Sequence, residues 1–288
     1  MKFLAENNNK KIVLALGFFD CLHKAHREII EKAISEAKGL DAESCVLTFT
    51  GNLKNSLQIY DFDDRVRLLE DIGVENVLKF DFNPQFASIK PEDFFKILVE
   101  KYGVVGVVCG YDYKFGKDAR GDVDLLKDLC AEYGVKLFVL EKKLLNGSTI
   151  STSKIKDFLS SGDIDNANSF LFKPYHIKSE VVKGRGEGHL FGFPTANLSL
   201  KNDKILPKSG VYGTMCDING KIYKSVTNVG VKPTFNDDTV SIETFIDDFS
   251  GNLYGENITI IFYKYLRETK KFDNINALKE QIYEDMRW

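Results

Sequence analysis

Two histidines three residues apart, His23 and His26, stand shortly after a short apolar run. The run, Ile12–Gly17, is typical of a buried strand, and a helical pattern begins at His26. A turn from a strand into a helix presents free backbone N–H groups and the positive end of the helix dipole to an anion. Two imidazoles at this spacing can donate hydrogen bonds to the same phosphate groups. The segment Gly17–His26 is therefore suited to attack on the α-phosphate of a nucleotide, which needs charge stabilisation and alignment but no protein nucleophile.

The histidine pair has two other interpretations. His-x-x-His can bind a metal, but only His176 and His189 remain in the chain and no cysteine is suitably spaced, so we expect no metal at this pair. Both residues can also be ordinary histidines on the surface of a helix, which is the commoner case for an isolated pair. The neighbouring motifs decide between the interpretations.

Polar segments follow another predicted strand and begin another predicted helix. Gly110–Lys117 comes directly after Val104–Cys109, which is wholly apolar and rich in β-branched residues. Ile150–Lys156 begins a helix with several hydroxyl side chains that can cap it. Ligands of parallel α/β sheets bind at the carboxyl ends of the strands. We therefore expect these segments to share one phosphate site with His23.

A second group of candidate residues lies in the last third of the chain. Alternate glycines in Gly184–His189 would let the backbone approach a polyphosphate closely. In the following segment, Gly192–Asn197, Thr195 and Asn197 offer a hydroxyl and an amide oxygen two residues apart, and both are hard ligands suited to Mg²⁺. Each motif also has a structural interpretation, as a mobile connection between strands and as a turn stabilised by Thr and Asn.

Two patterns of predicted secondary structure must position these residues. The pattern changes near residue 172. Strands and helices alternate before it, which specifies right-handed βαβ units and a parallel sheet covered on both faces. The predicted strands are Ile12–Gly17, Cys45–Phe49, Val77–Phe80, Val104–Cys109 and Lys136–Leu140. The predicted helices are His26–Ala37, Phe62–Ile72, Pro91–Lys101, Asp124–Tyr133, Thr152–Ser160 and Asp163–Phe170.

Helical periodicity stops after Phe172, and Lys173-Pro174 is the expected hinge. Asn219-Gly220 between two apolar runs predicts a type I′ hairpin. The pattern favours a small antiparallel barrel or sandwich closed by one helix, Asn276–Met286. The predicted strands are Tyr175–Val182, Val211–Ile218, Lys221–Val229, Thr239–Ile246 and Asn257–Tyr263. We thus predict two domains, residues 1–172 and 173–288.

Composition narrows the class of protein. The chain has 288 residues, of which 43% are hydrophobic and 28% charged, with a net charge of −3, as in ordinary globular proteins and unlike disordered ones. Neither half has the basic excess expected for nucleic-acid binding. Five widely spread cysteines without a Cys-x-x-Cys argue against a disulfide framework or a cysteine zinc site. With no run as long as a membrane span and no signal-peptide core, we expect a cytoplasmic protein that binds no membrane and has no evident obligate protein partner.

The motifs of the first half, in this order, resemble those of the bifunctional bacterial riboflavin kinase/FAD synthetase family. The resemblance implies a Rossmann-like nucleotidyltransferase module that acts as FMN adenylyltransferase, with His23 and His26 as catalytic residues. Cys21 and Ala25 replace two glycines of the family motif, and Gly51-Asn52-Leu53 stands where the family has prolines. The ATP and FMN site that the resemblance implies for this module comprises Gly17, Phe18, Asp20, Gly110, Asp112, Ser151 and Lys156. Lys156 replaces an arginine of the family motif.

The second half is similar to the riboflavin kinase of the same family over nearly all of 175–285. The resemblance implies a six-stranded flavin-binding barrel in which Thr195 and Asn197 hold Mg²⁺. It also implies that Glu243 is the general base for the ribityl 5′-hydroxyl, which attacks the γ-phosphate of ATP; Phe245 replaces the histidine of the family's Glu-Thr-His. The implied ATP and flavin site comprises Gly184, Gly186, Gly188, Gly192, Pro194, Thr195, Asn197 and Arg267.

The resemblance therefore implies an enzyme that uses ATP and Mg²⁺ to convert riboflavin to FMN and then FMN to FAD, with release of pyrophosphate. Two alternatives stay open. The chain can be a riboflavin kinase whose adenylyltransferase module is weak or inactive, because of Lys156 and the missing prolines. It can also be a non-catalytic flavin- or nucleotide-binding protein, although such a protein needs no general base at Glu243.

Overall fold

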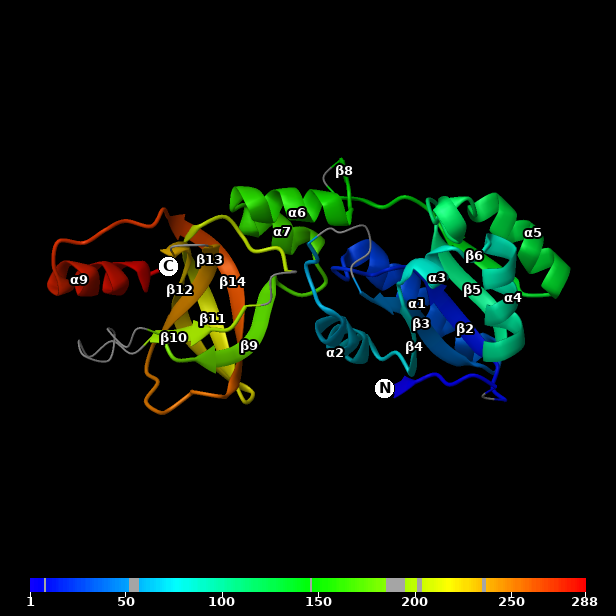
Figure 1. The fold of residues 1–288 in the computed structure, drawn as a ribbon, viewed down its shortest axis with the longest axis horizontal. Coiled ribbons are helices and arrows are strands. Elements are labelled where there is room, and N and C mark those ends of the chain that lie inside the picture. The colour runs from blue at the N-terminus through cyan, green and yellow to red at the C-terminus, as the bar shows by residue number, and fades with distance from the viewer. Residues whose placement is uncertain (8, 52–56, 146, 185–194, 201–203, 235–236) are drawn as a thin grey trace. The chain divides into compact units, whose positions relative to one another are not determined.

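The computed structural model describes residues 1–288 except for 8, 52–56, 146, 185–194, 201–203 and 235–236. The chain divides into two compact units, Met1–Thr152 and Ser153–Trp288. The first contains a parallel sheet with helices on its faces, and the second contains a closed antiparallel barrel (Figure 1). Both architectures agree with the fold classes predicted from the alternation of elements.

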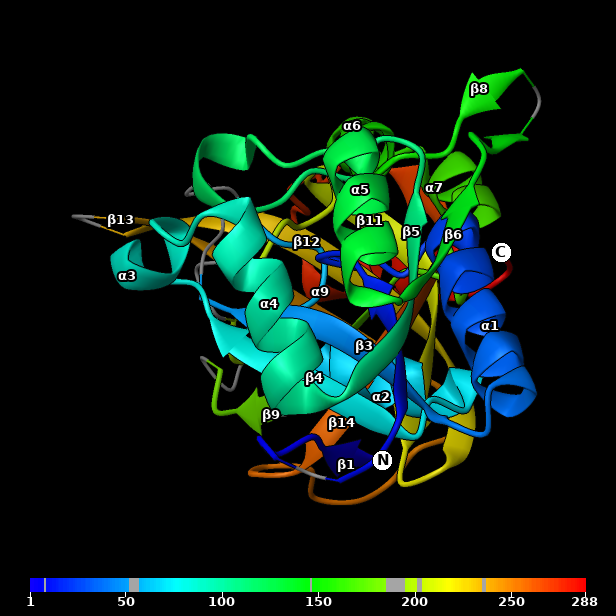
Figure 2. The same cartoon turned by 90° about the vertical axis from the view of Figure 1, so that its right-hand side faces the viewer.

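The first unit is built on a six-stranded parallel sheet with strand order β1-β4-β3-β2-β5-β6. Helices α4 and α5 cover one face of the sheet (Figure 2). Their side chains Phe95 and Leu129 belong to the same buried apolar cluster as Leu14 of β2. Helix α1 packs against β2, β3 and β5 through Ile30 and Ala33, which lie outside that cluster. The strands are β1 Lys2–Phe3, β2 Ile12–Leu16, β3 Glu43–Thr50, β4 Asn76–Asp81, β5 Val104–Gly110 and β6 Lys136–Leu140. The helices are α1 Lys24–Gly39, α2 Phe62–Ile72, α3 Pro84–Ala87, α4 Pro91–Tyr102 and α5 Val123–Tyr133, with a 3₁₀ turn at Lys117–Ala119.

The five predicted strands of this sheet are confirmed, but several short features, the 3₁₀ turn among them, were not predicted. Strand β1 adds an edge to the sheet beside β4, where Lys2 N–H donates to Glu75 O at 2.9 Å. A two-stranded hairpin, β7 Leu144–Leu145 with β8 Ser148–Thr149, follows β6, and α3 precedes α4. Elements this short are too brief to show a hydrophobic period.

The second unit is a closed barrel with strand order β10-β13-β12-β11-β14-β9. The hairpin at Asn219-Gly220 is confirmed, because Ile218 pairs with Lys221 and both turn residues have positive φ. Strand β10 was not predicted from the pattern. The strands are β9 His176–Val182, β10 Thr195–Leu198, β11 Gly210–Ile218, β12 Lys221–Thr234, β13 Asp237–Ile246 and β14 Asn257–Arg267.

Two predicted helices, α6 Thr152–Ser161 and α7 Ile164–Phe170, belong with the barrel apart from the first residue of α6. Lys208 N–H donates to Leu159 O at 2.9 Å. The side chain of Asn168 on α7 joins this helix to two segments of the barrel unit. Its Nδ2 donates to Phe262 O on β14 at 2.8 Å, and its Oδ1 accepts from the N–H of Tyr175 at 2.7 Å. The compact units thus divide between Thr152 and Ser153, about twenty residues before residue 172, and the domain boundary at residue 172 stays a prediction.

The closing helix, α9 Ile275–Asp285, packs on the outer face of the barrel. Val211 and Val226 form a small cluster there with Met286, which follows the helix. The indole of Trp288 lies directly on β11, where a Cβ on Gly213 would stand only 2.3 Å from Trp288 Cδ2. The absence of a side chain at Gly213 therefore lets the C-terminal residue pack against the strand.

Candidate active sites

The turn between β2 and α1 has an unusual backbone. Phe19 and Leu22 both have positive φ, 55° and 45°, although neither is a glycine. The ring of Phe19 folds back over Gly17, so that a Cβ on Gly17 would stand 2.8 Å from Phe19 Cζ. Such conformations cost energy and persist only where the surroundings hold them, as they often do at functional sites. Gly17 is thus required by the shape of this turn.

His23 is the N-cap of α1. Its Nδ1 accepts a hydrogen bond from His26 N–H at 3.0 Å. A neutral imidazole that accepts at Nδ1 carries its proton on Nε2, so this cap selects the tautomer with an Nε2–H donor. Burial lowers the pKa of His23 from 6.5 to about 4, against a smaller raising effect of a backbone hydrogen bond. His23 is therefore a neutral hydrogen-bond donor near pH 7.

His26 stacks on His23, with ring centroids 3.5 Å apart, and meets the edge of Phe19 at 5.1 Å. Burial, and then the nearby charge of His23, hold its pKa well below 6.5. The ring is partly exposed, but its Nδ1 is buried and has no hydrogen-bond partner among the described residues. A buried nitrogen in this state is costly unless a ligand completes it.

A cavity of about 350 Å³ opens at the carboxyl ends of the strands. It brings together three polar segments that are far apart in the sequence: the β2–α1 turn, the segment after β5 and the start of α6. Lys114, Lys142 and Lys143 also line it, and Lys143 forms an ion pair with Glu28. The predicted residues that line the cavity are Gly17, Phe18, His23, His26, Gly110, Asp112 and Ser151.

Two predicted residues have other places in the structure. Asp20 is buried, and its Oδ1 accepts hydrogen bonds from the N–H groups of Ile59 at 2.9 Å and Tyr60 at 3.4 Å. It therefore secures a neighbouring segment and does not line the cavity. Lys156 lies on α6, in the second compact unit, so its place at this site stays a prediction. Asn52 and Leu53 lie outside the described residues.

Arg65, a fully buried guanidinium on α2, was not predicted from the sequence. It lies over the ring of Phe18 at 4.7 Å and donates to Phe49 O at 2.6 Å and Tyr60 O at 2.9 Å. Arg65 thereby ties the end of β3 to the segment that Asp20 holds. No signal in the sequence marks it, because an arginine inside an amphipathic helix is ordinarily exposed.

A cysteine lies close to the two histidines in space, although its spacing in the sequence did not indicate a metal site. The side chains of Cys21, His23 and His26 bring their ligand atoms within 4.8 Å of one another. Cys21 Sγ also lies 3.4 Å from Thr152 Oγ1. The sharp turn produces this cluster, since it folds Cys21 back toward the start of α1.

In the barrel, the predicted residues form one row across neighbouring strands. Asn197 on β10 pairs with Glu243 on β13, and Glu243 pairs in turn with Asn228 on β12. Directly paired residues of antiparallel strands share a face, with Cβ atoms about 4.5–5.5 Å apart. Beyond Asn228 the row continues through Val211 to Arg267. The structure thus brings the predicted metal ligand Asn197 beside the predicted base Glu243, and it adds Asn228, which was not predicted.

The interior of the barrel explains why Glu243 lies on the other face. Its neighbour Thr244 is fully buried and its hydroxyl lies 2.9 Å from that of Thr227. Thr227 is linked through Thr214 to Ser225, each step at 2.8 Å. These hydroxyls satisfy one another inside the barrel. Alternation along β13 then places Glu243 outside.

Gly184 lies against Asn197, since a Cβ on this glycine would stand 2.4 Å from Asn197 Nδ2. A glycine here therefore leaves room for the amide. Thr195 lines a second cavity, of about 220 Å³, together with Phe249, Leu253 and Tyr254. The predicted residues Gly186, Gly188, Gly192 and Pro194 lie outside the described residues.

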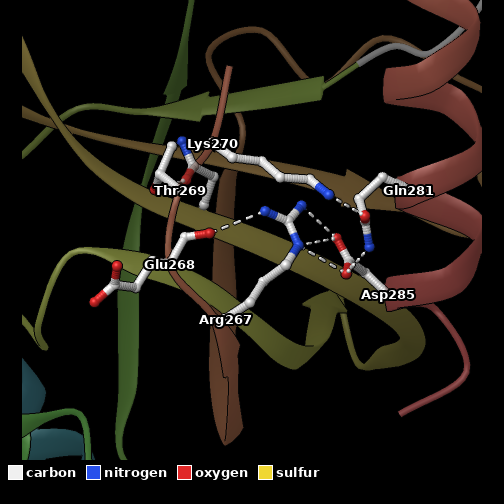
Figure 3. A network of polar contacts seen from close by, with 7 residues as sticks. Arg267, Glu268, Thr269, Lys270, Gln281 and Asp285 are labelled. Carbon is white, nitrogen blue, oxygen red and sulfur yellow. Dashed lines mark hydrogen bonds and ion pairs between the residues drawn. The ribbon is translucent and has the colours of Figure 1, made fainter. Parts of the chain in front are cut away.

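Arg267 is held by the closing helix. Its guanidinium forms a bidentate pair with Asp285, in which Nε donates to Oδ1 at 3.0 Å and Nη2 to Oδ2 at 2.7 Å (Figure 3). Gln281 also donates to Asp285, at 2.9 Å. Bidentate pairs of this kind are strong and directional. Arg267 therefore joins β14 to α9, and its contact with a ligand stays a prediction.

Two family models match the chain, one over the part that contains the parallel sheet and one over the part that contains the barrel. The model described as FAD synthetase matches residues 5–154, and the model described as riboflavin kinase matches residues 171–288. A crystal structure described as a macrolide-efflux protein from Streptococcus pneumoniae has the same fold over the whole chain, with a TM-score of 0.89, 27% identity and 97% of that chain covered. Among the described residues, no helix is long and apolar enough to cross a membrane.

Curated relatives carry both activities in their names. The bifunctional riboflavin kinase/FMN adenylyltransferase of Bacillus subtilis is 36% identical over 98% of this chain and 92% of its own length. The protein of the same name from Listeria monocytogenes is 32% identical over 95% of this chain and 90% of its own. Matches to both modules favour the two-activity interpretation over a kinase alone or a non-catalytic binding protein. The chain belongs to the bifunctional riboflavin kinase/FMN adenylyltransferase family, which makes FMN from riboflavin and FAD from FMN with ATP.

Proposed function

We propose that the cavity at the carboxyl edge of the parallel sheet is where FMN is adenylylated. A phosphate oxygen of FMN attacks the α-phosphate of ATP, and pyrophosphate leaves. The observation that carries this assignment is the N-cap hydrogen bond of His23, which leaves an Nε2–H donor on a residue that lines the cavity. Preorganised donors of this kind stabilise the charge that develops on a transferring phosphoryl group.

Basic groups in the cavity support the same assignment. Lys114 and Lys142 line it together with Asp112 and Glu141, and the N-terminus of α1 adds the positive end of a helix dipole. The two histidines supply neutral donors rather than charge, because burial opposes their protonation. In this proposal the histidines align the α-phosphate and the lysines attract the anionic substrates.

We assign riboflavin phosphorylation to the outer face of the barrel, around Asn197 and Glu243. Glu243 would accept the proton of the ribityl 5′-hydroxyl as it attacks the γ-phosphate of ATP. Thr195 and Asn197 are on one face of β10, both are partly exposed, and both offer oxygen atoms, the ligand type that Mg²⁺ prefers. They fit a magnesium ion, which when bound would neutralise charge on the phosphates of ATP. Asn228 on β12 pairs with Glu243 on β13, and it would orient the Glu243 carboxylate.

The assignment is tested by separating the two reactions in one protein. Glu243→Gln should lower kcat for FMN formation by about 10²-fold or more, the usual effect of losing a general base, and should leave FAD formation from supplied FMN nearly unchanged. His26→Ala should have the opposite pattern. Each reaction is followed by chromatographic resolution of riboflavin, FMN and FAD. Equal loss of both activities in either folded variant would refute the division of labour.

A further inference from the structure

A buried thiol and two imidazoles meet in the turn between β2 and α1. One ligand atom from each of Cys21, His23 and His26 lies within 4.8 Å of the other two. Cys21 is 1% exposed and His23 is 5% exposed. His26 Nδ1 is buried and has no hydrogen-bond partner in the described part of the chain. A buried nitrogen without a partner is costly, so a ligand that met it would stabilise the site.

The donor set selects a class of ligand. One thiolate and two imidazoles are borderline-soft donors, which bind Zn²⁺ well and Mg²⁺ poorly. Three protein ligands leave a fourth position of a tetrahedral ion for water. In such a site the ligand atoms stand about 3.3–3.6 Å apart. Side-chain rotations that draw the three groups together by about 1 Å would therefore complete it.

Metal binding has two local costs. If the cation takes His23 Nδ1, the N–H of His26 loses its acceptor, and a bond to Sγ replaces the contact of Cys21 with Thr152 Oγ1. Loss of a side-chain N-cap corresponds to roughly a fivefold change in an equilibrium constant. Structural zinc sites with four protein ligands reach binding constants of about 10⁷ or more, so a fivefold change is small beside the affinity that cysteine and histidine ligands can supply. The cap is thus too weak to prevent binding.

We infer that Cys21, His23 and His26 bind a divalent cation of the zinc class, and that this cation opposes adenylyl transfer. Binding releases the thiol proton to solvent and forms bonds from Sγ and two ring nitrogens to the metal. Both histidines line the 350 Å³ cavity, whereas Cys21 does not. A cation beside Cys21 therefore turns the imidazoles away from the cavity and withdraws donors from the nucleotide. This second effect rests on the proposed function, but the metal site does not.

The metal site is tested on the full chain with Co²⁺ as the probe. Wild type should show a thiolate-to-cobalt charge-transfer band and the strong visible bands of a tetrahedral ion. Cys21→Ser should lose the charge-transfer band although the four other cysteines remain. His23→Asn should weaken the visible bands while an asparagine still caps α1. Thermal melting establishes that each variant is folded. If Cys21→Ser does not fold, Cys21→Ala is used in its place.

The effect on catalysis is measured as the Zn²⁺ concentration that halves FAD formation from FMN. Cys21→Ser should raise this concentration at least about tenfold, the lower end of what loss of a metal-site partner costs. Total ATP is identical for both proteins, so chelation of zinc by ATP cancels. Absence of the charge-transfer band in wild type, or its persistence in Cys21→Ser, overturns the metal site. An unchanged zinc response in a variant that has lost the band overturns the inhibitory role. If wild type forms no FAD at all, the proposed function fails, and the cobalt spectrum still decides the metal site.

Discussion

Replacing His23 by asparagine should remove a specific part of the acid sensitivity of the parallel-sheet unit. Burial holds the pKa of His23 at about 4 in the folded chain, against 6.5 in an exposed histidine. As pH falls below 6.5, the unfolded chain takes up a proton at this position and the folded chain resists it. The free energy of unfolding therefore falls between about pH 6.5 and pH 4, and this group has no further effect below its folded pKa.

The size of this effect follows from the two pKa values. The full loss is about 3 kcal/mol, and about 2 kcal/mol of it should have occurred at about pH 5. Asparagine is as good an N-cap as any residue, so His23→Asn keeps the acceptor for His26 N–H while removing the titration. The variant should thus lose less stability than wild type when the pH is lowered from about 7 to about 5.

The assay is urea unfolding at both pH values, followed by circular dichroism and by tryptophan fluorescence. Trp288 is the single tryptophan and belongs to the barrel unit, so fluorescence reports the barrel alone. The transition seen by circular dichroism but not by fluorescence then belongs to the unit that contains His23. If wild type and His23→Asn lose the same stability on acidification, the buried neutral state of His23 is wrong.

Three further substitutions test other parts of the structure. Asn197→Ala should raise the concentration of Mg-ATP needed for FMN formation by about tenfold or more and spare FAD formation, and a matching rise for both reactions would contradict separate phosphate sites. Lys156→Arg should increase the rate of FAD formation, since a guanidinium can donate two hydrogen bonds to one phosphate where an ammonium is a point charge; an unchanged rate would exclude Lys156 from the site. Gly213→Ala should displace the indole of Trp288, shift its emission to the red and cost about 1–3 kcal/mol of barrel stability, and an unchanged emission maximum would show that the indole does not rest on this strand.

Local patterns in the sequence predicted the fold class of both units and most of their strands. The run at Ile12 and the β-branched run at Val104 predicted buried parallel strands, because strands covered on both faces are apolar at every position. Asn219-Gly220 predicted a hairpin, because both residues tolerate the positive φ that a type I′ turn requires. The motifs around His23 and Asn197 resembled one enzyme family, and that expectation was confirmed by the comparisons.

Tertiary structure alone decided which side chains meet. The register of β10, β12 and β13 places Asn197, Glu243 and Asn228 in one row, and register between strands depends on pairing of distant segments that no local period encodes. Burial of Arg65 against Phe18 is likewise invisible in an amphipathic pattern. The meeting of Cys21 with the two histidines depends on positive φ at non-glycine residues, a conformation that surrounding packing imposes against the preference of the residues themselves.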